Sequence, residues 1–476
     1  MRARRQVFIV GWDLDGRIAL TRPPADDGAP DGLRDLIDHI ARQRSDLDIY
    51  ILLWDYTVLY AGDRQWLPAW DFDWSTPSNV RFALDNKVPV GGSHHQKIVA
   101  IDDRLAFVGG LDLTRARWDT RSHDPDDPRR IDHAGDAEPA FHDVQLAIDG
   151  DAECAVGDLC RDRWRMATGD TVGPATGSDG TPWPDGLDAA WRDVGIGVAR
   201  TLPEFEGRPQ AREVLALYQD AIAAARESIY LENQFLAAGP VAAALADRLA
   251  EPEGPDVVIV TQRGCASWME EQVMGLRRAQ ILHRLHECDR HGRLRVLGSV
   301  VPGLSEEQYT LHSKVGVFDD RLVRIGSANL NNRSMGYDSE CDLAIACDDD
   351  EKRAAARVFR DGLIAEHCGV TLDTVEDAIA RCGSLAGALD ALLRSDGRRL
   401  VPLPIPDEPP ETVELLTTLG DPEKPISASD WLKFAGDGGG VRSRLRRRRI
   451  VRAALATLVA LTGVAAWRLL LAGALF

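Results

Sequence analysis

The sequence lacks an excess of positive charge, since the formal net charge of the 476-residue chain is −19. Proteins that bind nucleic acid over a broad surface need that surface to be basic, so this class is disfavoured, and only a local basic pocket stays compatible with the charge. The eight cysteines include no C-x-x-C pair, and the chain is 44% hydrophobic. A chain of this length can bury a core without disulfide staples. We therefore expect reduced thiols rather than a disulfide framework or a zinc site.

We expect no signal peptide at the start of the chain either, because the apolar run Val7–Val10 is far shorter than the hydrophobic region that such a signal needs. The other end differs. Six arginines in residues 442–449 precede an apolar stretch, 453–476, which Arg468 interrupts. This stretch is long enough to span a bilayer, and we expect a transmembrane helix in residues 441–476, with a helix lying on the membrane surface as the alternative. The arginines predict that the preceding chain lies in the cytoplasm, at the inner membrane, with secretion as the alternative.

An internal repeat organises most of the chain. The stretch "HHQKIVAIDDRLAFVGGLDL" (94–113) aligns with "LHSKVGVFDDRLVRIGSANL" (311–330) at an offset of 217 residues, and eight of the twenty aligned positions are identical. Both stretches contain the pattern His-x-Lys-x-x-x-x-Asp. Two further pairs of segments match in the same order: 4–13 with 226–235, and 142–149 with 339–346. We interpret the chain as an internal duplication.

Hydrophobic periodicity predicts the fold class. Short apolar runs at 98–101 and 315–318 end in polar turns and are typical of strands, whereas 212–228 and 240–254 have helical patterns. The alternation predicts an α/β protein with two duplicated lobes, mixed sheets flanked by helices, packed about a pseudo-twofold axis, plus the C-terminal hydrophobic helix. The first half begins almost at its first strand, so its lobe is expected to lack the helix that opens the second one. Either one sheet face is left uncovered or the start is assigned too late.

Changes in composition predict the domain boundaries. Gly, Pro, Ser and Thr are frequent in 169–187, and proline is frequent in 401–411. The predicted parts are a first lobe (1–168), an inter-lobe loop (169–187), a second lobe with a helical extension (188–400), a Pro/Gly-rich linker (401–440) and the Arg-rich segment with the hydrophobic helix (441–476).

The repeated block contains the residue types that phosphoryl transfer needs. A pseudo-twofold axis would bring one histidine and one lysine of each half into a single cleft: His95, Lys97, His312 and Lys314. Four converging donors suit a tetrahedral phosphate. One imidazole could attack phosphorus while the other protonates the leaving oxygen. This scheme needs no metal ion, and the sequence shows no carboxylate cluster of the kind that magnesium prefers.

Four acidic residues complete the predicted catalytic set. Asp143 and Glu340 are equivalent in the repeat and could orient the histidines, as the carboxylate of a catalytic triad does, with a surface or salt-bridging role as the alternative. Asp102 and Asp319 close the two motifs. Because each lies seven residues after its histidine, we expect them to pair with or cap a turn rather than to transfer a proton.

Further residues are predicted to bind substrate. The glycines at 109–110, like Gly326 and Ser327, sit where the backbone should come close to the phosphate or to the opposite lobe. Asn329 could donate its amide to an oxygen, and its counterpart in the repeat is Asp112. The predicted substrate-binding residues are Gly109, Gly110, Asp112, Gln234, Ser327 and Asn329.

Four stretches beside the motifs make the pattern specific: "AFVGGLDL" (106–113), "FHDVQLAIDG" (141–150), "YLENQF" (230–235) and "IGSANLNNRSMGYDSE" (325–340). Over about residues 6–350 the chain resembles the phospholipase D superfamily, in its phospholipid-acting bacterial branch. The resemblance implies an active site made of the paired histidines and lysines, a phosphohistidine intermediate, and no metal or other cofactor. It favours His95 as nucleophile and His312 as general acid. Phe141 departs from the tryptophan that many members carry.

The resemblance implies a phospholipase D-type phosphodiesterase that hydrolyses phospholipids, such as phosphatidylcholine, to phosphatidate and the head-group alcohol. We expect a monomeric catalytic unit that acts at a phospholipid membrane surface and not on nucleic acid. One alternative is a phosphatidyltransferase of the cardiolipin synthase kind, which uses the same intermediate but a lipid hydroxyl in place of water. A nuclease is the other, and the net charge of −19 disfavours it.

Overall fold

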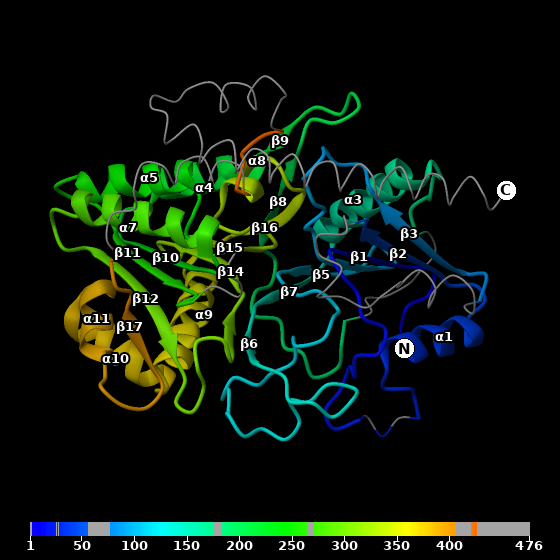
Figure 1. Cartoon of the computed structure of the whole chain (residues 1–476), viewed down its shortest axis with the longest axis horizontal. Helices are drawn as coiled ribbons and strands as arrows, with labels where there is room; N and C mark the ends of the chain where they lie inside the picture. Colours follow the sequence, from blue (N-terminus) through cyan, green and yellow to red (C-terminus); the bar gives the residue numbers. More distant parts are fainter. Residues whose placement is uncertain are drawn as a thin grey trace, which may run out of the picture. The chain divides into compact units, whose positions relative to one another are not determined.

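The computed structural model describes residues 2–24, 26, 28–55, 77–175, 183–264, 271–405 and 420–425. By its contacts the chain divides into two compact units, one of residues 1–54 with 67–424 and one of residues 55–66 with 425–476. Nearly all described residues belong to the first unit, which includes both copies of the repeat (Figure 1).

The first half builds a mixed sheet. Among the described residues its strand order is β3-β2-β1-β4-β5-β7, in which β1, β2 and β3 are parallel and the other pairs are antiparallel. The elements are β1 (Gln6–Gly11), α1 (Leu33–Gln43), β2 (Asp48–Trp54), β3 (Val80–Asp85), β4 (Ile98–Ile101), β5 (Leu105–Gly109), β7 (Gln145–Asp149) and α3 (Asp151–Thr168).

The second half builds a larger mixed sheet, with the order β17-β12-β11-β10-β14-β15-β16-β8-β9 in the described part of the chain. Its strands are β8 (Gly195–Leu202), β9 (Ala211–Arg212), β10 (Ser228–Asn233), β11 (Asp256–Thr261), β12 (Leu294–Val300), β14 (Lys314–Phe318), β15 (Leu322–Gly326), β16 (Glu340–Ala346) and β17 (Arg399–Pro402). Its helical elements are α4 (Glu213–Ala224), α5 (Gly239–Ala250), η2 (Glu271–Gly275), α7 (Leu276–Cys288), α8 (Asn332–Gly336), α9 (Asp350–Cys368), α10 (Leu372–Cys382) and α11 (Leu385–Leu392).

The two sheets share the same core pairing, which confirms the predicted α/β class. Strand β1 is parallel to β2 and antiparallel to β4, and β10 is likewise parallel to β11 and antiparallel to β14. Each β10 residue is buried, because side chains alternate between two covered faces. Helices α4, α5 and α7 cover the face of Leu231, and α9, α10 and α11 cover the face of Tyr230 (Figure 1).

The expectation of an uncovered face in the first sheet is wrong. Trp164 of α3 packs in the same cluster as Phe8. On the opposite face, Ile9 and Ile51 are 7% and 0% exposed and pack with Ile37 of α1. No helix precedes β1 in the described residues, so α4 has no counterpart there. Helix α1 contributes its buried residues Leu33, Ile37 and Ala41 to the cluster on that face, so among the described residues the face is covered without a helix before β1.

Short parallel pairings join the two halves. Strand β13 (Tyr309–Leu311) pairs with β6 (Ala140–His142), although they belong to different copies of the repeat. The corresponding contact of the other copy is a single parallel bridge between His94 and Ser339. Each pairing ends one residue before a motif histidine, at Leu311 and at His94, so these pairings between the halves determine the geometry of the site.

None of the helices in the described parts of the chain is long and apolar enough to cross a bilayer. The predicted transmembrane helix, 441–476, lies outside the described residues. So do most of the linker 401–440 and residues 176–182 of the inter-lobe loop.

Candidate active site

Each motif histidine is hydrogen-bonded to a carboxylate of the other half. The Nδ1 atom of His95 lies 3.0 Å from each oxygen of Glu340, and the Nδ1 atom of His312 lies 2.8 Å from Oδ2 of Asp143. The His95 and His312 side chains are 17% and 12% exposed, whereas Glu340 is 0% and Asp143 5% exposed. A carboxylate at Nδ1 fixes the tautomer that leaves the Nε2 lone pair free. No residue in the described ranges bonds either Nε2 atom.

Backbone hydrogen bonds explain why each histidine is paired with a carboxylate of the other half. The His95 amide donates to the carbonyl oxygen of Ser339 (2.9 Å), the residue before Glu340. In the same way the His312 amide donates to the carbonyl oxygen of His142 (2.8 Å), the residue before Asp143. Each histidine therefore lies just before a strand of its own sheet, beside the chain that is about to enter the other sheet.

The two motif lysines are buried and have different partners. The Lys97 ammonium donates to the His95 carbonyl oxygen (2.9 Å) and lies 3.1 Å from Oδ2 of Asp112. The Lys314 ammonium donates to the His312 carbonyl oxygen and to Oε1 of Gln234 (3.4 Å). One lysine faces a carboxylate and the other an amide, so the duplicated site is chemically asymmetric.

The same asymmetry appears in the protonation of the second motif. Burial lowers the pKa of Lys314 to about 7, and the Lys97 cation adds to this effect while Asp143 opposes it. Burial also lowers the pKa of His312 well below its usual value, and the Lys314 cation adds to this effect. Burial raises the pKa of Asp143 to about 6 although Lys314 opposes the rise.

Glu340, the carboxylate that pairs with the first motif, has a pKa shift opposite in direction to that of Asp143. Burial alone would raise the pKa of Glu340, but His95 and a hydrogen bond from the Ser327 hydroxyl (2.5 Å to Oε2) outweigh it. The pKa of Glu340 therefore lies below its usual value. Ser327 also accepts the Cys341 amide (3.0 Å), which holds the hydroxyl in place. The predicted substrate-binding Ser327 thus lies against the carboxylate that orients His95.

A Cβ atom added to any of the predicted glycines would lie closest to atoms of the glycine's own half, and the approach of their backbone to the phosphate or to the opposite lobe stays a prediction. A Cβ atom on Gly110 would lie 2.6 Å from Oδ1 of Asp143, and one on Gly109 would lie 2.6 Å from the Val144 carbonyl oxygen. A Cβ atom on Gly326 would overlap the Asp342 carboxylate. Close packing of β5 on β7, and of β15 on β16, requires glycine at these positions.

The motif aspartates Asp102 and Asp319 bind backbone and touch neither histidine. Asp102 accepts the amides of residues 4–6 at 2.5–2.9 Å, and Asp319 those of residues 226–228 at 2.6–2.9 Å. Both have positive φ, 58° and 52°, and each is the first residue of the three-residue connection of a hairpin, 102–104 or 319–321. Their inclusion in the catalytic set is not supported by this placement, which instead matches a turn role.

Asn329 lies beside the site but is held by its backbone. Its amide donates to the Ser334 hydroxyl (3.2 Å), and its side chain is 5% exposed. Its Oδ1 atom is buried and has no hydrogen-bond partner among the described residues. The predicted amide donation to a substrate oxygen therefore stays a prediction.

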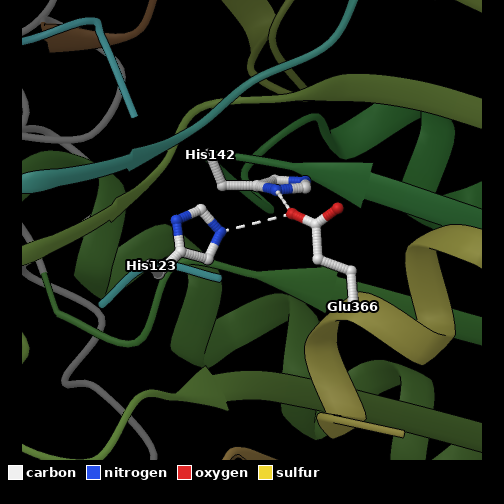
Figure 2. Close-up of side chains that lie close together, drawn as sticks. All are labelled: His123, His142 and Glu366. Carbon is white, nitrogen blue, oxygen red and sulfur yellow. Dashed lines mark hydrogen bonds and ion pairs between the residues drawn. The ribbon is translucent and has the colours of Figure 1, made fainter. Parts of the chain in front are cut away.

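Sequence reasoning missed a buried cluster of imidazoles and carboxylates beside the second motif. Figure 2 shows the carboxylate of Glu366 between the rings of His123 and His142. Glu232 and His367 continue the cluster. The ligand atoms of His123, His142 and Glu366 lie within 4.8 Å of one another, as do those of His142, Glu232 and His367, so either group could hold a metal ion by distance. The histidine of "FHD" and the glutamate of "YLENQF" were the available signals.

Comparison with known proteins links this geometry to a family. A family model described as "Cardiolipin synthase, PLD-like domain" matches residues 218–361. Phospholipase D A of Dictyostelium discoideum is 26% identical over 412 residues, covering 73% of this chain and 31% of that protein. Phospholipase D alpha 4 of Arabidopsis thaliana is 23% identical over 497 residues, covering 79% of this chain and 63% of that protein. The chain thus spans about a third of the first relative and less than two thirds of the second.

A solved structure shows the same fold. The crystal structure of phosphatidylserine synthase from Haemophilus influenzae Rd KW20 matches with a TM-score of 0.52 and 15% identity, covering 82% of this chain and 90% of that one. At this identity the likeness concerns the fold alone, namely the α/β arrangement of helices on mixed sheets.

Proposed function

The chain belongs to the phospholipase D superfamily, and we propose that it hydrolyses phospholipids, such as phosphatidylcholine, to phosphatidate and the head-group alcohol. The observation that carries the proposal is the exchange of carboxylates between halves, which presents two imidazoles with unoccupied Nε2 atoms beside two buried ammonium groups. This arrangement offers a nucleophile, an acid and charge stabilisation to a phosphodiester anion.

In the first step His95 is the nucleophile. Glu340 accepts its Nδ1 proton, so the Nε2 lone pair attacks phosphorus and forms a P–N bond. The bond from phosphorus to the head-group oxygen breaks, and that oxygen takes a proton from Nε2 of His312. Lys97 and Lys314 hold the nonbridging oxygens. The product is a phosphatidyl-histidine and a free alcohol.

In the second step water replaces the head group. Nε2 of His312, now neutral, takes a proton from water, whose oxygen attacks phosphorus. The P–N bond breaks, its electron pair returns to Nε2 of His95, and phosphatidate leaves. The low pKa of His312 keeps its Nε2 atom unprotonated, as this role as base requires. A bound phosphodiester anion offsets the lysine cations and raises that pKa for the role as acid.

Transfer to a lipid alcohol is the second candidate, and the match of 218–361 to a model described as "Cardiolipin synthase, PLD-like domain" favours it. Both activities share the first step and differ only in the acceptor. Vesicles of phosphatidylglycerol alone separate them. Phosphatidate as the main product by mass spectrometry supports hydrolysis, whereas cardiolipin as the main product supports transfer.

The covalent step is tested with mixed phospholipid vesicles and ethanol. A phosphatidyl-enzyme partitions between water and ethanol, so phosphatidylethanol should appear at the expense of phosphatidate while total head-group release stays constant. Head-group release without any phosphatidylethanol would contradict the covalent intermediate. Absence of head-group release from every phospholipid tested would contradict the proposed function itself.

We also propose that residues 441–476 hold the enzyme at the inner face of a membrane. Their arginines attract anionic lipids by about 1 kcal/mol for each residue near the surface. Deleting 441–476 should leave turnover of a short-chain, micellar phospholipid unchanged and weaken vesicle binding in a flotation assay. Loss of activity on the short-chain substrate would show that the segment belongs to the site. Protease digestion of the preceding chain from outside intact cells would contradict the cytoplasmic placement.

A further inference from the structure

Behind the second motif runs a chain of side chains that alternate between carboxylate and imidazole. Its members in order of contact are Asp119, His123, Glu366, His142, Glu232 and His367. Successive nitrogen and oxygen atoms are separated by 2.7, 3.2, 2.8, 2.9 and 3.0 Å. They come from four places in the sequence: the segment after β5, strand β6, strand β10 and helix α9. Figure 2 shows three of them, His123, His142 and Glu366. The cluster therefore exists only in the folded chain.

The pKa shifts and the burial of these side chains indicate that the six residues form a network of charged groups, called the ion network below. Burial alone would lower the pKa of His142, but Glu232 and Glu366 flank the ring and raise it well above its usual value. Burial opposes the ionisation of Glu232 as well, yet His367 and His142 lower its pKa well below the usual value. An imidazolium has no lone pair for a metal ion, and both His142 nitrogens donate to a carboxylate. The distances alone therefore do not make this a metal centre.

Glu232 is saturated by donors, and one of them belongs to the second motif. Its Oε1 accepts from the Tyr230 hydroxyl (2.6 Å) and from His367, and its Oε2 accepts from His142 and from the Ser313 hydroxyl (2.8 Å). Ser313 is the residue between His312 and Lys314. A fully buried carboxylate with four donors is rigid, because rotation would break several charge-assisted bonds at once.

Two more contacts tie the network to His312. The His142 carbonyl oxygen accepts the His312 amide (2.8 Å), and the next residue, Asp143, supplies the carboxylate at Nδ1. Asp119 accepts the Phe141 amide (2.9 Å), and the ring centroid of Phe141 lies 5.3 Å from that of His312. The network thus holds the segment 141–143 in place. This segment in turn contacts His312 in three ways: Phe141 lies near the His312 ring, the His142 carbonyl oxygen binds its backbone amide, and Asp143 binds its Nδ1 atom.

The first motif is supported by different chemistry. By the repeat alignment, Val10 is the counterpart of Glu232 and Gln96 that of Ser313. Gln96 donates to the Glu340 carbonyl oxygen (3.1 Å) and accepts from Arg163 (3.1 Å), which in turn lies 2.7 Å from Asp85. The side chains behind His95 are therefore Arg163 and Asp85, with His94 3.1 Å from the same Asp85 carboxylate. Among the described residues, the six-membered imidazole–carboxylate network contacts the second motif and not the first.

We propose that His142 and Glu232 are positioning residues that hold His312 in the orientation for proton transfer, and that they leave the attack by His95 unaffected. The proposal rests on the proposed function, in which His312 protonates the leaving oxygen. It follows from the one-sided contacts: every bond from the network to a motif reaches the second motif. A misplaced acid slows only steps in which a proton must reach the leaving oxygen.

The leaving group provides the test. A choline head group must be protonated as it leaves, whereas p-nitrophenolate leaves as a stable anion without a proton. Phosphatidylcholine and phosphatidyl-p-nitrophenol in mixed micelles are compared in single-turnover quenched flow with enzyme in excess. For Ser313→Ala and His142→Gln we expect head-group release from phosphatidylcholine to slow by roughly 10- to 100-fold. Release of p-nitrophenolate should stay within about threefold of wild type.

Two contrasts make the result specific. His312→Ala should show the same dependence on the leaving group, more strongly, whereas Gln96→Ala should slow both substrates alike because Gln96 supports the His95 side. Ser313→Ala leaves Glu232 three donors, so it provides a folded variant if His142→Gln does not fold. Equal slowing of both substrates by Ser313→Ala, or no slowing of either, would overturn the inference. Absence of release by wild type from both substrates would instead count against the proposed function.

A zinc titration tests the alternative that the cluster binds a metal ion. For an ion network, stoichiometric zinc should leave the denaturation midpoint of the wild-type protein unchanged. Zinc that raises the midpoint in wild type but not in His142→Gln would establish a metal centre and overturn the positioning role as stated.

Discussion

The Nδ1 atom of His95 lies 3.0 Å from the carboxylate of Glu340, a residue 245 positions further along the chain. Asp143 and His312 repeat this relationship in the opposite direction, with 2.8 Å between Nδ1 and Oδ2. Neither half of the duplication can orient its own histidine by these bonds. A separated half would therefore carry a motif without its orienting carboxylate.

Replacing either motif histidine should abolish turnover without unfolding the protein. Each imidazole performs a different part of one reaction, so His95→Ala and His312→Ala should each lower kcat on phosphatidylcholine by at least about 1000-fold. Both side chains are partly exposed and belong to no hydrophobic cluster, so circular dichroism should show wild-type structure. A single variant that retains a substantial fraction of turnover would contradict the shared site. Phosphate trapped on His312 instead of His95 would reverse the two roles.

Asp143→Asn should stabilise the protein while it lowers activity. The carboxyl pKa is about 6 in the fold, above the usual value of 3.8. Below pH 3.8 folded and unfolded chains both bind the proton. As pH rises to about 6 the unfolded chain loses it first, so stability falls. Above pH 6 the ionised group costs on the order of 1–3 kcal/mol, which the amide avoids. Urea titrations of both proteins at pH 4 and pH 7.5 measure this, and a gain that is equal at both values would contradict it.

Inorganic phosphate should raise the pKa of His312. Burial and the Lys314 and Lys97 cations hold that pKa well below its usual value. A bound anion offsets these cations, so the imidazole gains a proton at higher pH than before. Nitrogen chemical shifts of the ring, followed against pH with and without phosphate, measure the change, and His312→Asn identifies the signal. A His312 pKa that stays constant at saturating phosphate would contradict the idea that a bound anion promotes protonation of the general acid.

Loss of the motif aspartates should cost stability more than chemistry. Asp102→Ala and Asp319→Ala each leave three backbone amides without their carboxylate, which should lower the free energy of unfolding by about 2–4 kcal/mol. Active-site titration allows kcat to be expressed per folded molecule, and this value should stay within about threefold of wild type. A loss of kcat as large as that of His95→Ala would show that these residues take part in catalysis.

Activity should persist in EDTA. The two imidazoles and two ammonium groups already supply the nucleophile, acid and charge stabilisation that a metal ion could otherwise provide. Turnover of a soluble phosphodiester such as bis(p-nitrophenyl) phosphate should therefore be equal with and without chelator. A soluble substrate avoids the effect of divalent ions on membrane surfaces. Loss of turnover that zinc or magnesium restores would contradict the metal-free scheme.

The sequence by itself determined the duplication, the α/β class and the motif residues. These features depend on short-range patterns: apolar runs and helical periodicity predicted β4, β14, α4 and α5, and the spacing of histidine and lysine survived in both copies. The hairpin turns at Asp102 and Asp319 were likewise predictable, because a polar pair between two apolar runs is a local signal.

Only the tertiary structure decided which residues meet. The pairing of His95 with Glu340 depends on a parallel bridge at Ser339, and that of His312 with Asp143 on β6 and β13, contacts that no local pattern specifies. For the same reason the glycines proved to accommodate carboxylates of their own half. The network of His142 and Glu232 joins four distant segments, and its charges are stable because their mutual pairing, which only the folded chain provides, outweighs the burial that opposes them.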